Sequence, residues 1–280
     1  SQTYQINKII VVDDGSIDKT AEIVKSIIVA VPVTLISQNN KGPNAARNEG
    51  LRQSDSEYIA FLDADDFWKK DKVEKQMSVF ESSEYENLGL VYCGYELIDE
   101  NGKKIIKKII KPVLRGKIFQ KLLKANLISG SPSTVLMKKE VLEKVGFLDE
   151  SLRGSEDWDM WLRIAEKFDF DYVDESLIYV ADLTESNSKN FELMLINRIL
   201  FINKWIHIIS KYDRLVVYHR NKLVSGAIRC KIKNQFFRIA ETISRYISTD
   251  ARNILFGGKI NITKSVFSVL FSYLFRRKLW

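Results

Sequence analysis

The sequence predicts an α/β fold, in which a domain with a mostly parallel central sheet is followed by a helical C-terminal region. Residues 1–65 alternate short apolar runs with amphipathic stretches, as in a parallel sheet covered by helices. From Phe191 onward, apolar residues recur every three or four positions, which is typical of one face of a helix. A length of 280 residues suits one substantial domain and a smaller one. We therefore expect a domain in residues 1–189 and a basic helical region in residues 190–280.

The expected elements follow in order along the chain. Strands are expected at 9–12, 33–36, 58–62 and 89–97, with an edge strand or a solvated loop at 103–111. Helices are expected after a cap at Asp18, from Gly42-Pro43 to Leu51, and over 67–82, 140–147 and 156–168. In the C-terminal region one stripe comprises Phe191, Leu195, Ile199, Ile202, Ile206 and Ile209.

Composition excludes several classes of protein. With 45% hydrophobic and 28% charged residues, the chain is neither disordered nor a polytopic membrane protein. Cys93 and Cys230 form neither a disulfide framework nor a zinc-ligand spacing, which indicates a reducing compartment. We expect no secretory signal peptide, because Ser1-Gln2-Thr3-Tyr4 is polar, and no membrane span, because no apolar run reaches about 18–20 residues.

The formal charge of +7 is unevenly distributed. Residues 1–189 hold 26 basic and 32 acidic residues, whereas residues 190–280 hold 17 basic and 4 acidic residues. Such an asymmetry is typical of a protein that meets an anionic surface through its basic part.

Carboxylates follow two of the expected buried strands. Asp13-Asp14 ends the first strand, and Asp63-Ala64-Asp65-Asp66 ends the strand at 58–62. Ligands of open α/β sheets bind outside the carboxyl ends of the strands, so these acids should line one crevice. A hard divalent ion, Mg²⁺ or Mn²⁺, would take oxygen ligands there from carboxylates and from a diphosphate.

Each acidic cluster also has a structural interpretation. Asp-Asp-Gly-Ser is a common turn sequence, and Asp65-Asp66 could cap the following helix. Their pairing, each directly after a buried strand, favours a functional site.

A third acidic group opens the helix at residue 156. Ser155 would cap this helix, acids would fill its first turn, and Trp158, Trp161, Leu162 and Ala165 would pack inward. Alternatively, one acid points into the crevice as a general base, since a carboxylate beside apolar walls can have a raised pKa. Without further observations the capping interpretation is favoured.

These motifs together resemble the family 2 glycosyltransferases. The resemblance covers about Gln2 to Tyr179, and its motifs are IIVVDDGS, NKGPNAARNEGL, YIAFLDADDFW, SPSTVLMKKEVLEKVGFLDE and GSEDWDMWLRIA, in the order of the family. It implies the nucleotide-sugar-binding fold called GT-A and the transfer of a sugar with inversion at the anomeric carbon.

The resemblance also implies a role for individual residues. Asp13 or Asp14 would contact the base and ribose of the nucleotide, and Arg47 would lie near its diphosphate. Asp63 and Asp65 would form the DxD element, with Asp65 as the stronger candidate for the metal ligand. Of the Glu156-Asp157 pair, Asp157 would be the catalytic base. The acceptor side would be shaped by Ser131, Ser133, Thr134 and Trp158.

The chain departs from the family pattern in two places. Family members usually begin some thirty residues earlier, so the first strand and helix and part of the nucleotide pocket are expected to be absent. After Leu177-Ile178-Tyr179 the family often has an arginine and a histidine, where this chain has Val180-Ala181-Asp182. We expect His207 and His219, in the helical region, to be structural or surface residues.

The composition of the C-terminal region predicts that it binds a membrane surface. Ile262 to Phe275 is apolar and aromatic, and it is followed by Arg276-Arg277-Lys278. This combination suits the interface of an anionic membrane; packing on the domain or a dimer contact are the alternatives. We expect no nucleic-acid partner, because no binding motif accompanies the charge.

The leading hypothesis is a metal-assisted glycosyltransferase on the cytoplasmic face of the cell membrane. It would use a UDP-sugar and a glycan or lipid-linked acceptor in surface polysaccharide synthesis. The alternative is a nucleotide-sugar-binding protein of weak or no activity, because of the absent first strand. A sugar-phosphate nucleotidyltransferase would need a glycine-rich loop with a basic residue near the N-terminus, and the sequence has none.

Overall fold

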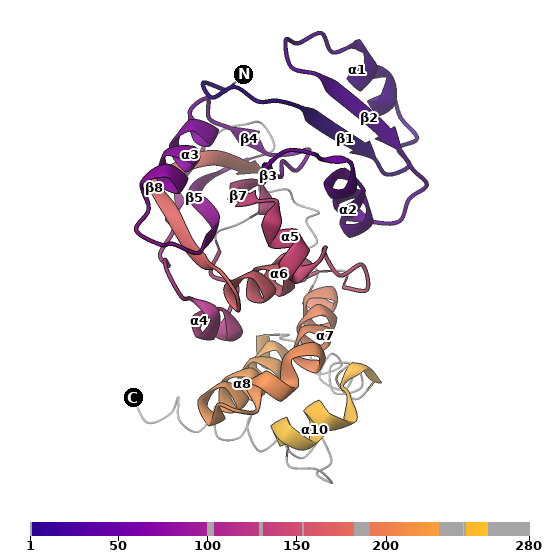
Figure 1. The fold of residues 1–280 in the computed structure, drawn as a ribbon. Coiled ribbons are helices and arrows are strands. Elements are labelled where there is room, and N and C mark those ends of the chain that lie inside the picture. Colours follow the sequence, from indigo (N-terminus) through magenta and orange to yellow (C-terminus); the bar gives the residue numbers. More distant parts are fainter. Residues whose placement is uncertain are drawn as a thin grey trace. The chain divides into compact units, whose positions relative to one another are not determined.

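The structure is a computed structural model that describes residues 2–99, 104–128, 131–152, 154–181, 191–229, 243 and 245–256. The chain divides into two compact units, residues 1–184 and 185–280. The first unit contains both sheets, and the second consists of helices in its described part (Figure 1). The apolar stretch at 262–275 lies outside the described residues, so the membrane-binding interpretation of this stretch stays a prediction.

The chain begins with a small parallel layer. Strands β1 (Ile9–Asp13) and β2 (Val33–Ser37) pair in parallel, with Ile9 opposite Val33. Helices α1 (Thr20–Ser26) and α2 (Pro43–Gln53) follow these strands in a β–α–β–α order (Figure 1). The predicted alternation of strands and helices is confirmed. The expected burial of these strands on both faces is not, because β1 and β2 are mostly only partly buried and Ile9 is 40% exposed.

A six-stranded sheet forms the centre of the first unit. Its strand order is β3-β7-β5-β8-β4, and β6 also pairs with β5. The strands are β3 (Tyr58–Ala60), β4 (Phe67–Trp68), β5 (Leu88–Ile98), β6 (Lys104–Ile110), β7 (Val135–Lys138) and β8 (Asp169–Ala181).

The direction of the strands corrects one prediction. Only β5 and β8 run parallel, whereas the other four pairings of this sheet are antiparallel. A buried apolar run predicts a strand but does not reveal the direction of its neighbour. The α/β class itself is confirmed, with a sheet that combines both directions.

Strands β5 and β8 carry most of the core. Leu90, Val91, Tyr92 and Cys93 of β5 are fully buried, as are Phe170 and Ile178 of β8. The register between the two strands shifts near Gly94, where an added Cβ would lie 2.5 Å from the Ile110 carbonyl oxygen. A glycine is therefore required where β6 approaches this irregularity.

Short helices cover the sheet and place the loops of the site. They are α3 (Lys72–Ser82), α4 (Phe119–Lys124), the 3₁₀ turn η1 (Pro132–Thr134), α5 (Glu140–Val145) and α6 (Glu156–Ala165). The predicted helix over 67–82 begins only at Lys72, because Phe67–Trp68 pair with Ile178 and Tyr179 of β8. Asp65-Asp66 therefore do not cap this helix.

The second unit is helical in its described part. Its helices are α7 (Phe191–Ile209), α8 (Asp213–Arg229) and α10 (Thr249–Phe256). The predicted stripe is buried at Leu195, Ile199, Ile202, Ile206 and Ile209. In the described part of the chain, no helix is both long and apolar enough to span a bilayer.

Candidate active site

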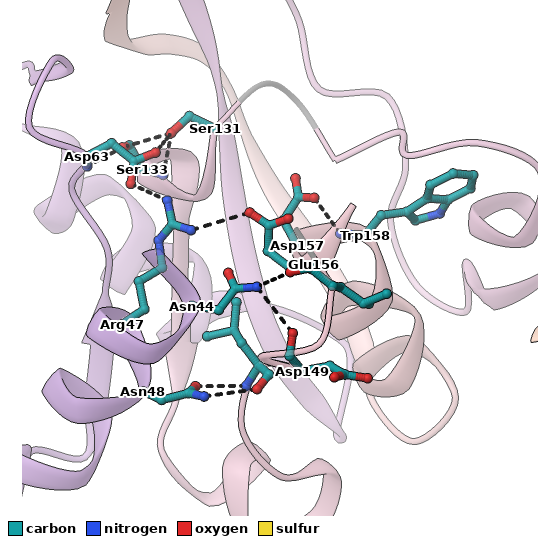
Figure 2. A network of polar contacts seen from close by, with 12 residues as sticks. Asn44, Arg47, Asn48, Asp63, Ser131, Ser133, Asp149, Glu156, Asp157 and Trp158 are labelled. Atoms are coloured by element: carbon teal, nitrogen blue, oxygen red, sulfur yellow. Dashed lines mark hydrogen bonds and ion pairs between the residues drawn. The ribbon is translucent and has the colours of Figure 1, made fainter. Parts of the chain in front are cut away.

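Arg47 occupies the centre of the candidate site. Its Nη2 lies 2.6 Å from Asp63 Oδ1, and its Nη1 lies 3.6 Å from Glu156 Oε1. The three side chains come from α2, from the segment after β3 and from the start of α6 (Figure 2). Arg47 thus joins two of the predicted carboxylates, Asp63 and Glu156, in one network.

Hydroxyl groups hold Asp63 from the side opposite to Arg47. Ser131 Oγ donates to Asp63 Oδ2 at 2.9 Å, and the Asp63 backbone N–H donates to Ser133 Oγ at 2.9 Å. Thr134 Oγ1 donates to the Ser131 carbonyl oxygen and so braces the turn η1. Ser131 and Ser133 contact Asp63, and Thr134 contacts Ser131; their role on the acceptor side stays a prediction.

The Asp157 carboxyl group is held by two donors. The Trp158 backbone N–H donates to its Oδ1 at 2.7 Å, and Asn126 Nδ2 donates to its Oδ2 at 2.9 Å. Burial raises the pKa of Asp157 to about 6, and the neighbouring Glu156 charge adds to this effect. The two hydrogen bonds and the Arg47 charge lower the pKa of Asp157, but they are the weaker influences.

Helix α6 begins without the predicted cap. Ser155 has a φ of 66°, and its side chain makes no capping hydrogen bond. The predicted inward packing is confirmed, since Trp158, Trp161, Leu162 and Ala165 are all buried. The Trp158 indole donates to the Leu122 carbonyl oxygen at 2.7 Å and points away from the two acids (Figure 2).

The carboxylates after β1 hold backbone turns. The Ser16 N–H donates to Asp13 Oδ1 at 2.9 Å, as expected for the turn interpretation. Asp14 accepts hydrogen bonds from Gln38 Nε2 and from the N–H groups of Lys41 and Gly42. Although burial alone would raise the pKa of Asp14, these bonds and the Lys41 charge hold it below its usual value.

A cavity of about 250 Å³ adjoins the Arg47–Asp63 pair. It lies between β1 and β3, and α2 also contributes to its wall. Among the described strands β1 pairs only with β2, and β3 pairs only with β7, so each has a free edge. The lining residues include Ile10, Val12, Arg47, Gly50, Ile59, Phe61 and Asp63.

The metal-binding prediction rests on Asp63 and Asp65. Asp65 is exposed, whereas both carboxylate oxygens of Asp63 already have partners. Among the described residues no three Asp, Glu, His or Cys side chains come together as a metal-ligand group. The oxygen donor set suits Mg²⁺ or Mn²⁺, and a bound diphosphate would have to supply further ligands.

Three asparagines of the network escaped the sequence analysis. Asn126 follows α4 and carries no sequence signal, since neither the helix nor its contact with Asp157 was predicted. Asn44 and Asn48 flank Arg47 on α2 and bind the segment 148–152. Their spacing of four residues places them on one helix face, which is the signal that could have identified them.

The two histidines lie in the helical unit, as the sequence indicated. His219 is fully buried, and its Nδ1 lies 3.3 Å from Arg198 Nη2. His207 is exposed, and its Nε2 lies 3.7 Å from Asp250 Oδ2. Both therefore have the structural or surface positions that were expected.

Relatives of known sequence are named as glycosyltransferases. An uncharacterized glycosyltransferase of Rickettsia typhi is 31% identical over 201 residues, covering 69% of this chain and 61% of the relative. A second one, from Rickettsia conorii, is 26% identical over 278 residues, covering 96% of this chain and 44% of the relative. The chain thus spans about half the length of these two relatives.

Solved structures confirm the type of fold. The S. aureus TarS 1-349 structure in complex with UDP-GlcNAc matches with a TM-score of 0.65 at 16% identity, covering 97% of this chain and 84% of that one. A mannosyltransferase from Pyrobaculum calidifontis in complex with GDP-Man and Mn²⁺ has a TM-score of 0.53 at 15% identity, covering 95% and 77%. The fold is therefore that of the GT-A glycosyltransferases.

The family comparison covers most of the chain. The sequence profile described as "Glycosyltransferase like family 2" matches residues 1–219, which include every residue of the candidate site. The chain therefore belongs to the glycosyltransferase-like family 2.

Proposed function

We propose that the protein is an inverting glycosyltransferase. It would move a sugar from a nucleoside diphosphate, UDP in the first instance, to a hydroxyl group of a glycan or lipid-linked acceptor of surface polysaccharide. One observation carries this proposal: Arg47 joins Asp63 to Glu156, beside an Asp157 carboxyl group with a pKa of about 6. The relatives named as glycosyltransferases and the similar structures solved with UDP-GlcNAc and GDP-Man support the same chemistry.

Arg47 is the proposed contact for the donor diphosphate. Its Nη1 is buried and has no hydrogen-bond partner, and a phosphoryl oxygen would satisfy it. The guanidinium group would neutralise charge that develops on the departing diphosphate. Asp13 or Asp14 would contact the base and ribose at the end of β1.

Asp63 and Asp65 are the proposed residues for a divalent cation. When bound there with the diphosphate, Mg²⁺ or Mn²⁺ would stabilise the negative charge of the leaving group. Ser131 and Ser133 hold the Asp63 carboxylate and backbone in place for this role.

Asp157 is the proposed general base. Its carboxylate would take the proton of the acceptor hydroxyl while that oxygen forms a bond to the anomeric carbon. The bond from this carbon to the diphosphate breaks in the same displacement, so the nucleoside diphosphate leaves and the configuration inverts. A pKa of about 6 keeps the base mainly ionised at neutral pH and still suited to accept a proton.

The alternative function is nucleotide-sugar binding with weak or no transfer. It is favoured by the engagement of both Asp63 oxygens, one with Arg47 and one with Ser131. A cation at Asp63 would have to share these oxygens with Arg47 and Ser131 or displace one of the two contacts.

A donor screen that measures release of nucleoside diphosphate tests the two functions. The glycosyltransferase proposal expects acceptor-dependent release, reduced about 10²–10⁴-fold in Asp157→Asn. Asp174→Asn is the matched control, because Asp174 lies on β8 with a side chain that is 64% exposed. Calorimetric binding of UDP and Mn²⁺ without turnover would instead support the binding protein.

We also propose that residues 190–280 place the protein on the cytoplasmic face of an anionic membrane. This region has 17 basic and only 4 acidic residues, and its net positive charge supports this location.

A further inference from the structure

We propose that Asn44 and Asn48 are positioning residues for the general base. They fasten the segment 148–152, and through it the start of α6, to the helix that carries Arg47. The inference rests on the proposed function, because it explains how Asp157 is held in a fixed position relative to the proposed donor-binding residues.

The contacts are numerous and buried. Asn48 donates to the Leu148 carbonyl oxygen at 2.9 Å and accepts from the Leu148 N–H at 3.0 Å, and it also donates to Glu150 Oε1 at 2.8 Å. Asn44 donates to the carbonyl oxygens of Asp149 and Leu152, at 3.2 and 2.6 Å. Figure 2 shows both side chains directed from α2 toward this segment. The two asparagines are 5% and 2% exposed.

These residues and Arg47 share one face of α2. Positions 44, 47 and 48 are three and four residues apart, which places their side chains on the same side of a helix. Arg47 contacts Asp63 on the donor side and Glu156 at the start of α6. The single helix α2 therefore contacts both sides of the proposed reaction.

The segment 148–152 is well placed to control Asp157. It ends four residues before Glu156, the first residue of α6. Arg163, near the other end of α6, donates to the carbonyl oxygens of Val145 and Phe147, the latter at 2.8 Å. Because Arg163 holds the C-terminal part of α6, loss of an asparagine should affect mainly the start of the helix, where the Trp158 indole is a remaining anchor.

A displacement of the helix start would affect the reaction more than donor binding. Misplacement of a catalytic group by about 1 Å can cost about 10²-fold in rate. The donor contacts proposed for Arg47, Asp63 and Asp65 do not pass through segment 148–152. We therefore expect a lower kcat with a nearly unchanged affinity for the donor.

The test compares Asn48→Ala and Asn44→Ala with a matched control, Asn203→Ala. Asn203 makes the same kind of double backbone contact in the helical unit, to the Tyr246 carbonyl oxygen and the Ser248 N–H. We expect kcat to fall about 10–100-fold in the two α2 variants, with the donor dissociation constant changed by less than about threefold. Asn203→Ala should leave both quantities unchanged.

A second variant protects the test against misfolding. Asn48→Ser keeps a small polar side chain and adds no charge beside Glu150, but it is too short to make the hydrogen bonds to Leu148. If Asn48→Ala does not fold, this second variant provides the test, and its kcat should fall by a similar factor. A folded variant of either kind with unchanged kcat would overturn the proposal, even if its melting temperature is lower.

Hydrogen exchange separates this inference from the proposed function. If the wild-type protein transfers no sugar, the proposed function fails, but the positioning contacts can still be measured. Asn48→Ala should speed exchange of amides at 154–159 and leave those beside Arg163 unchanged. Equal acceleration along all of α6, or none, would contradict the positioning role.

Discussion

The pKa of the Asp157 carboxyl group is determined by its burial and by its neighbouring residues. Burial and the Glu156 charge raise its pKa to about 6, while Asn126 and the Trp158 N–H limit the rise. Both acids were evident in the sequence, but the capping interpretation of the helix start was favoured there. The contribution of Asn126 could not be anticipated, since it is 31 residues away from Asp157 in the chain.

The pH profile of transfer follows from this carboxyl group. Below a pH of about 6, Asp157 is protonated and cannot accept the proton of the acceptor, so kcat should fall about tenfold per pH unit. Asn126→Ala removes a hydrogen bond that favours the ionised form, and it should move the midpoint upward. A profile measured at constant ionic strength, with Asn87→Ala as the control for asparagine loss, checks this expectation. A midpoint that stays near 4 in the wild type would contradict it.

Lys72 is a buried cation that the proposed mechanism does not use. Its Nζ lies 2.6 Å from Gln76 Oε1 and 4.2 Å from the centre of the Trp68 ring. Burial lowers the pKa of Lys72 to about 8. Gln76 in turn donates to the carbonyl oxygens of Val91 and Thr134, so it joins β5 to η1 behind the site.

Lys72 should make stability depend on pH in the alkaline range. Its folded pKa of about 8 lies below the unfolded value of 10.5, so between them the unfolded chain binds more protons. The free energy of unfolding should therefore rise with pH across this window, by roughly 2–4 kcal/mol in total. Lys72→Met should be more stable at pH 7 and lack this rise. Lys75→Met, at a partly exposed lysine on the same helix, is the control in urea titrations and should keep the rise. A rise retained in Lys72→Met would refute the assignment.

At the scale of elements, the helix-ending glycine after α5 was predicted correctly. Gly146 has a φ of 76°, and its N–H donates to the Leu142 carbonyl oxygen at 2.8 Å. Strand β7 was not predicted, because the apolar run Val135–Met137 is short and lies directly before this helix. Local sequence identified the stop signal but not a strand whose partners are β3 and β5.

Gly146→Ala should lower stability through backbone strain. An added Cβ would lie 4.0 Å from Arg163 Nη1, so space is available and the positive φ is the cost. We expect a loss of about 1 kcal/mol in the free energy of unfolding. Gly146→Asn should lose less, because asparagine tolerates this conformation. Urea unfolding of both variants provides the measurement, and equal losses would point to a steric cause instead.

The two sheets show the limit of prediction from sequence at this scale. The β1–α1–β2–α2 layer followed from alternating apolar runs, because its contacts are local. The antiparallel insertion of β7 between β3 and β5 depends on long-range pairing, which residue patterns do not encode. In the site, Arg47 and the acids were identified individually, while their contacts through Ser131 and the asparagines required the folded chain.

At the scale of the whole molecule, the distribution of charge suggests a measurable behaviour. The excess of basic residues in 190–280 predicts binding to vesicles of anionic lipid at low salt. Binding should weaken steeply as ionic strength rises to about 0.5 M, because exposed charges are then screened. Cosedimentation of the full chain with anionic and neutral vesicles checks this prediction. Equal binding to both lipid types would exclude an electrostatic mechanism.

The contact between α2 and the segment 148–152 also affects how the chain is made. Asn48 pairs with Leu148, one hundred positions later, so a nascent chain on the ribosome lacks this contact until Leu148 has emerged. At about 5–20 residues per second, this delay lasts about 5–20 s. During that time the α2 asparagines face water, and the first layer depends on its local pairing alone. The contact that joins α2 to the segment before α6 therefore forms only after this interval.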